Sequence, residues 1–159
     1  MAGAANLQCN DKDHTKVTHA DGLRAWAKGS FPCEAATELL LRGFGGRFAA
    51  PGNPWIGTDE FSGASWIDFA SIPEYAGRVS NGEWGFLMFA ASMAEGVPVN
   101  LAEIVTVVNR ESVALLLASI AHASGSHEHS WEKADRVELA GFNRLPGLYS
   151  WPGKHAEGR

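Results

Sequence analysis

The sequence predicts a mainly α-helical (α+β) domain, a compact bundle of about five helices with one small β-hairpin and an irregular C-terminal tail. Three observations lead to this prediction. Helix-capping residues recur before apolar segments, a Gly- and Pro-rich stretch with short aromatic pieces interrupts them, and the chain turns polar after residue 124. With 159 residues, 45% of them hydrophobic, the chain suits one domain with a single core.

The chain divides into three expected parts. Residues 1–17 are small, polar and charged, and are expected to form a flexible N-terminal arm. Residues 18–124 are expected to form the helical core domain, with a hairpin at 47–69. Residues 125–159 are expected to be an extended C-terminal segment that packs on the core or on a partner.

Two helices are predicted at the start of the core domain. Thr18 or Asp21 can cap a first helix that ends at Gly29. Ser30, with a proline two residues later, begins a second helix over 31–42, which a run of glycines ends.

A β-hairpin is predicted next. Short aromatic and β-branched pieces over 54–58 and 64–69 are separated by Gly, Asp and Ser, which is typical of two strands and a turn. Two strands alone are marginally stable, so the hairpin must pack on the helices, with Trp55 and Trp66 as its expected anchors.

Four further helix starts follow the hairpin. Ser71 and Ser80 each precede a glutamate by three residues, which is the spacing of a capping box. Asn100 and Asn109 can cap two more helices.

The two most apolar segments are predicted to lie in the middle of the domain. Residues 83–95 and 111–123 are apolar nearly all round, and a helix of this kind is expected to be buried on every side. The helix at 31–42 is expected to pack across them.

Residues 79–83, Val-Ser-Asn-Gly-Glu, resemble the nucleotide-holding signature of ABC-type ATPases. In that family an apolar strand and a loop follow, so Glu103 and Asn109 fall near the positions of the catalytic Glu and the loop Asp. The family's phosphate loop, Gly-x-x-x-x-Gly-Lys-Ser/Thr, has no counterpart in this chain, and Ala102 stands where the metal-holding Asp is expected. We therefore interpret the motif as a helix-capping box without nucleotide function.

A second resemblance covers residues 19–48 and 114–129, which are similar to small uncharacterised proteins of actinobacteria. This resemblance implies a bacterial source and brings no activity with it.

Composition restricts the partners and the compartment. The net charge of −5, with scattered Lys and Arg, disfavours a nucleic-acid partner. The two cysteines form no framework of spaced pairs, which predicts reduced thiols and a cytoplasmic location. No apolar stretch approaches the ~20 residues of a membrane span, and no signal peptide is expected.

A cluster of histidines suggests one alternative function. His122, His127 and His129 are close in sequence and can hold Zn²⁺ if a fourth ligand approaches, which gives a small metal-dependent enzyme. Candidates for that ligand are His14, His19 and Cys33. The simpler interpretation is that His122 lies near a helix end and the other two in a solvated loop, with no cofactor bound.

Residues 101–120 suggest another alternative, a DNA-binding regulator. They contain two short helices and a turn, as a helix-turn-helix does. The second helix carries mainly apolar side chains, which suit a core and not the edges of bases.

The leading hypothesis is a non-catalytic cytosolic interaction or regulatory module that docks on another macromolecule, a protein first of all. The six Trp and eight Phe are plentiful, and several lie outside the helices, where they either anchor an interface or hold a tail on its own domain. The sequence identifies no catalytic residue and does not predict the oligomeric state. The interface candidates are Trp55, Phe61, Trp131, Phe142, Tyr149, Trp151 and Arg110.

Overall fold

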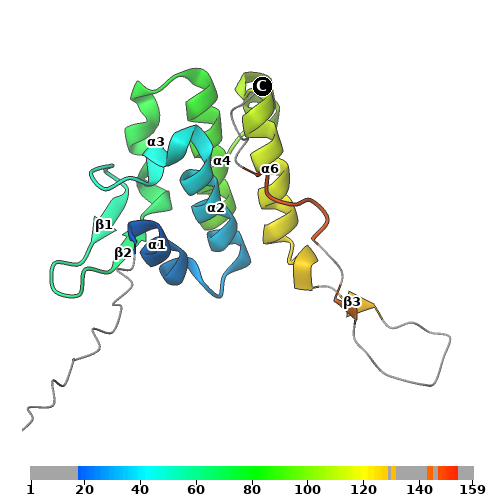
Figure 1. The fold of residues 1–159 in the computed structure, drawn as a ribbon. Helices are drawn as coiled ribbons and strands as arrows, with labels where there is room; N and C mark the ends of the chain where they lie inside the picture. The colour runs from blue at the N-terminus through cyan, green and yellow to red at the C-terminus, as the bar shows by residue number, and fades with distance from the viewer. Residues whose placement is uncertain (1–17, 129, 132–142, 145–146, 154–159) are drawn as a thin grey trace, which may run out of the picture.

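The computed structural model describes residues 18–128, 130–131, 143–144 and 147–153 (Figure 1). Over these residues the chain is mainly helical, with six α-helices and a small antiparallel β-hairpin on one side, which confirms the predicted fold class. The expected N-terminal arm lies outside the described residues. No helix in the described part of the chain is long and apolar enough to cross a membrane.

The first two helices begin at the predicted caps. In front of α1 (His19–Ala27), the Thr18 hydroxyl accepts a hydrogen bond from the Asp21 amide, and the Asp21 carboxylate accepts one from the Thr18 amide. Ser30 caps α2 (Phe31–Arg42), and a 3₁₀ turn rich in glycine (Gly43–Ala49) follows it. Gly45 and Gly46 adopt positive φ there, which ends the helix as predicted.

The predicted hairpin consists of β1 (Ile56–Thr58) and β2 (Ser65–Ile67), with Ile56 opposite Ile67. Trp55 anchors it as expected, because its ring is buried and its indole N–H donates to the Phe48 carbonyl at 2.8 Å.

Trp66 is not an anchor, contrary to the prediction. Neighbouring side chains of a strand point to opposite faces, so Ser65 and Ile67 are buried while Trp66 faces outward over Gly57. Ile67 therefore supplies the second anchor of the hairpin.

The short helix α3 (Ile72–Tyr75) lacks its predicted capping box. Asp68 caps the 3₁₀ turn Phe69–Ser71 that precedes it, and the Ser71 hydroxyl donates to the Asp68 carbonyl at 2.9 Å. The Ser71 oxygen caps no amide of α3, because the chain is already helical at this residue.

The helix α4 (Asn81–Glu95) begins with the predicted capping box. The Ser80 hydroxyl accepts from the Glu83 amide, and the Glu83 carboxylate accepts from the Ser80 amide at 3.0 Å. Asn100 and Asn109 cap α5 (Leu101–Val107) and α6 (Arg110–Ala123), again as predicted. Only two residues separate α5 from α6.

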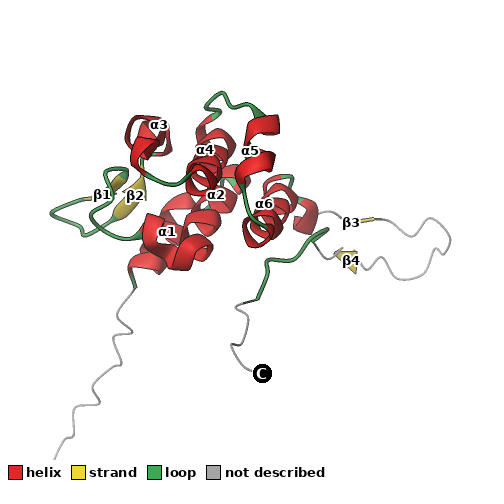
Figure 2. Cartoon of the chain, turned by 90° about the horizontal axis from the view of Figure 1, so that it is seen from above, coloured by secondary structure: helices red, strands yellow, loops and turns green. Residues whose placement is uncertain are grey.

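The centre of the bundle is α2, and this corrects the predicted arrangement. α1, α4 and α6 surround α2 (Figure 2). Its small residues Ala35 and Ala36 are fully buried and allow neighbouring helices to approach closely. The segment 83–95 is largely buried, as expected, but 111–123 lies at the edge of the bundle and exposes part of its apolar surface.

The C-terminal segment begins with a 3₁₀ turn (Ser126–Glu128). The two-residue strands β3 (Ser130–Trp131) and β4 (Asn143–Arg144) then pair antiparallel. Residues 147–153 return to the bundle, where the Leu148 amide donates to the Ser126 hydroxyl at 3.2 Å. The sequence also allows a strand at 137–140, and these residues lie outside the described part of the chain.

Candidate protein-docking face

The outer surface of α6 is apolar along its length. Val113, Leu117 and Ile120 are 37%, 46% and 48% exposed. Their spacing of four and three residues places them one above another on a single side of the helix. We call these three residues the α6 stripe. Leu115, on the opposite side of the helix, and Leu116, which borders the stripe, are both buried against the bundle.

The preceding helix α5 also has two exposed apolar residues. Leu101 and Val105, four residues apart, are 56% and 54% exposed. α5 and α6 lie on the side of the bundle away from the β1–β2 hairpin (Figure 2). Single exposed apolar residues are common on monomers, whereas several gathered on adjacent helices are typical of a docking surface.

The titratable residues of α6 lie at its two ends, and none lies along the α6 stripe between them. No charged residue follows Glu111 within α6 other than His122 in its last turn. Arg110, the first residue of the helix, is exposed and makes no ion pair in the described part of the chain. The positive end of the helix dipole is unfavourable for this cation, so folding of the single chain gives Arg110 no evident stabilising partner.

The aromatic interface candidates are scattered. Trp55 is buried in the core, so it is not available for docking, which corrects its inclusion among the candidates. Phe61 is fully exposed in the turn between β1 and β2, and this hairpin lies on the side of the bundle away from α6 (Figure 2). Trp131 belongs to β3, and its side chain is not described; Phe142 lies outside the described residues.

Trp151 holds the C-terminal segment on its own domain. The Arg42 guanidinium lies 5.0 Å from the centre of the Trp151 ring, and the His122 ring lies 6.2 Å from it. Tyr149 is about half exposed on the same segment. Among the proposed interface residues whose side chains the structure describes, Arg110 alone is next to the α6 stripe.

Sequence reasoning missed the α6 stripe because it treated a helix apolar all round as buried all round. The spacing of Val113, Leu117 and Ile120 was present in the sequence, but so was the equally apolar opposite side of the helix. Whether one side of this helix or both are buried depends on the arrangement of the other helices. The local sequence does not determine that arrangement.

Two of the three predicted metal-ligand histidines come together. The His122 and His127 rings stack with centres 4.5 Å apart, and His122 Nε2 lies 2.9 Å from a Glu34 oxygen. The amide of Gly29, with help from His122, holds the pKa of Glu34 below its usual value despite burial. His129 lies outside the described residues, and no three ligands converge among those described, so zinc binding stays a prediction.

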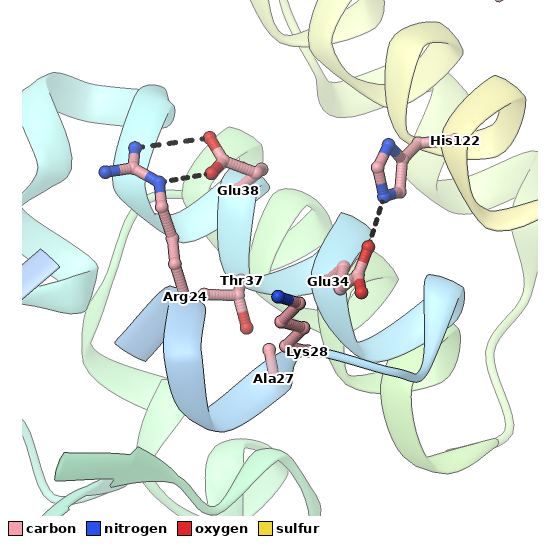
Figure 3. Close-up of a pocket in the computed structure, with 7 residues that line it drawn as sticks. All are labelled: Arg24, Ala27, Lys28, Glu34, Thr37, Glu38 and His122. Atoms are coloured by element: carbon pink, nitrogen blue, oxygen red, sulfur yellow. Dashed lines mark hydrogen bonds and ion pairs between the residues drawn. The ribbon is translucent and has the colours of Figure 1, made fainter. Parts of the chain in front are cut away.

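A pocket of about 270 Å³ lies between α1, α2 and α6 (Figure 3). Its charged groups are mostly paired with one another: Arg24 binds Glu38 at 2.5 Å, and Glu34 binds His122. Lys28 makes no ion pair in the described part of the chain. The pairs join α1, α2 and α6. The residues that line the pocket are Arg24, Ala27, Lys28, Glu34, Thr37, Glu38 and His122.

The residues that resemble the ABC-type signature have structural partners. Besides the Ser80 amide, Arg47 binds the Glu83 carboxylate. The Ser80 amide is the main cause of the lowered pKa of Glu83. Glu103 accepts a hydrogen bond from the Asn100 side chain at 3.1 Å. These contacts explain the residues that resemble the signature as parts of helix starts.

No family model, curated protein or solved structure matches this chain. The similarity to actinobacterial proteins therefore stays a prediction, and inference about function rests on the surface described above.

Proposed function

We propose that this chain is a non-catalytic cytosolic interaction module that docks on another protein through the outer surface of α5 and α6. The observation that supports this proposal is the exposed α6 stripe on a well-packed helix. The docking surface differs from the hairpin and aromatic tail favoured by the sequence, since Trp55 is buried and Trp151 packs on its own domain.

The energy available from this surface is moderate. Burying a half-exposed Val, Leu or Ile side chain contributes about 1 kcal/mol. A partner that covers both helices thus gains roughly 5 kcal/mol from Leu101, Val105 and the α6 stripe, before the costs of association. Additional contacts around the stripe are needed for tight binding, and a partner with its own apolar helix supplies them best.

The chemistry of the surface favours a protein over DNA. Reading of base edges requires hydrogen-bond donors and acceptors, and phosphate binding requires several Lys or Arg residues. The α6 stripe has neither, and Arg110 is the sole Lys or Arg of α6. The helix-turn-helix alternative is therefore less well supported than a protein partner.

A single charge in the α6 stripe tests the proposal. We expect the full chain to capture a protein from native lysate, and Leu117→Glu to reduce that capture at least tenfold, because the carboxylate would have to be buried without a partner. Leu148→Glu is the matched control: it places the same charge on a highly exposed leucine of the C-terminal segment. Equal capture by Leu117→Glu, or loss only with Leu148→Glu, would overturn the proposal.

A further inference from the structure

The apolar residues of the α6 stripe have nearly the same spacing when the direction of the helix is reversed. Leu117 lies near the middle of α6, with Val113 four residues before it and Ile120 three residues after it. If two copies of α6 packed antiparallel about an axis at Leu117, Leu117 would face its counterpart, and Val113 would face Ile120 of the other copy. A two-fold interface requires a patch that is complementary to itself, and alternating spacings of three and four are those of paired helices.

Arg110 distinguishes the antiparallel arrangement from the parallel one. Arg110 lies seven residues before Leu117, and Ser124, the C-cap of α6, lies seven residues after it. An antiparallel copy therefore brings the last turn of its α6, the negative end of the helix dipole, near the unpaired guanidinium, although the carbonyls of Ile120, Ala121 and His122 there already accept hydrogen bonds within their own chain. A parallel copy would place two Arg110 side chains next to each other, which is repulsive.

We infer that the protein covering the α6 stripe is a second copy of this chain, with the two α6 helices packed antiparallel. This inference rests on the proposed function, because it names the partner of the same surface. The lack of charge between Glu111 and His122 allows two identical helices to approach without repulsion along the stripe. α6 has 14 residues and is therefore about 21 Å long, which makes the interface small and the dimer concentration-dependent.

Sedimentation equilibrium of the full chain tests self-association. We expect the mass to rise from 17.0 kDa toward twice that value between micromolar and millimolar concentration. Leu117→Glu should stay monomeric throughout, since two carboxylates would meet at the axis, and Leu148→Glu should associate like the unmodified chain. Leu117→Lys repeats the test with the opposite charge, and circular dichroism verifies that each variant is folded.

Cysteine cross-linking tests the orientation. In a Cys9→Ser, Cys33→Ala background, we expect a short bis-maleimide to join Val113→Cys to Ile120→Cys when the two variants are mixed. Val113→Cys alone should not cross-link, because the two copies of residue 113 would lie about 12 Å apart along the helix axis. Efficient cross-linking of Val113→Cys to itself would indicate a parallel pair and overturn the inference.

The two proposals fail in different ways. A chain that stays monomeric at every concentration overturns the inference about a second copy. If that monomer still captures a different protein and Leu117→Glu abolishes the capture, the docking function stands and its occupant is the captured protein. Association that Leu117→Glu leaves unchanged shows that the dimer uses another surface, and it also overturns the inference.

Discussion

Glu38 is the residue on which the ion pairs of the first two helices converge. Its carboxylate binds Arg24 of α1 at 2.5 Å and Arg42, one turn later on α2, at 2.7 Å. Burial alone would raise the pKa of Glu38, but the hydrogen bonds and charges of the two arginines outweigh it and lower the pKa below its ordinary value of 4.5. The ionised carboxylate therefore stabilises the fold.

This lowered pKa gives a pH dependence of defined sign. The contribution of Glu38 to the free energy of unfolding is present above pH 4.5 and is lost as the pH falls from there through the folded pKa. We expect Glu38→Gln to lower the free energy of unfolding by about 1–2 kcal/mol at neutral pH, reduced by the exposure of Arg24.

Urea unfolding of both proteins at a series of pH values measures this effect. The gap between the original chain and Glu38→Gln should narrow as the pH falls below about 4.5, because other carboxylates titrate alike in the two proteins. A gap that stays constant over this range would show that the ion pairs do not contribute through the charge of Glu38.

At the scale of elements, α6 has two sides of similar composition and different roles. Leu116 packs into the core and Leu117, the next residue, is about half exposed on the stripe. We expect Leu116→Ala to lower the free energy of unfolding by about 2–5 kcal/mol through loss of contacts and a cavity. Leu117→Ala should lower it by less than about 1 kcal/mol.

Chemical denaturation of the two variants at low protein concentration, where association does not contribute, makes this comparison directly. The pair is matched in residue type, helix and position. Similar losses of stability in both variants would mean that the stripe is covered within a single chain, and the docking face would have to be abandoned.

Helix starts were predictable from the sequence because a cap depends on a few neighbouring residues. Thr18, Ser30, Ser80 and Asn109 cap as predicted, whereas Ser71 does not, because the backbone is already helical at this residue. The arrangement of the helices was not predictable in this way. The small buried residues of α2 allow other helices to pack closely around it, whereas α6 packs on the bundle through one side only.

The candidate site was the least predictable part for the same reason. The sequence indicates Arg110 as an interface candidate, but it does not distinguish the apolar residues beside it from core residues. The alternation of side chains along a strand follows from the sequence and places Ser65 and Ile67 on one face and Trp66 on the other. Trp66 was expected to be an anchor because it is aromatic, and this expectation was wrong because its face of the strand points outward.

At the scale of the whole molecule, the described elements pack around α2, and the outer side of α6 has no other described element packed on it. The hairpin and α1 lie on one side of α2, and α6 forms the opposite edge (Figures 1 and 2). Residues 147–153 pack by Trp151 beside the last turn of α6, near the pocket of paired charges. The α6 stripe is thus presented on a rigid helix, with little rearrangement needed for docking.

Methyl NMR of the intact chain tests the docking face most directly. The account predicts that the methyl signals of Val113, Leu117 and Ile120 shift when the bound protein, whether a second copy or another chain, is titrated in, while the methyl signals of Leu148 stay in place. Unchanged signals of the α6 stripe in a sample where binding is saturated would contradict the account.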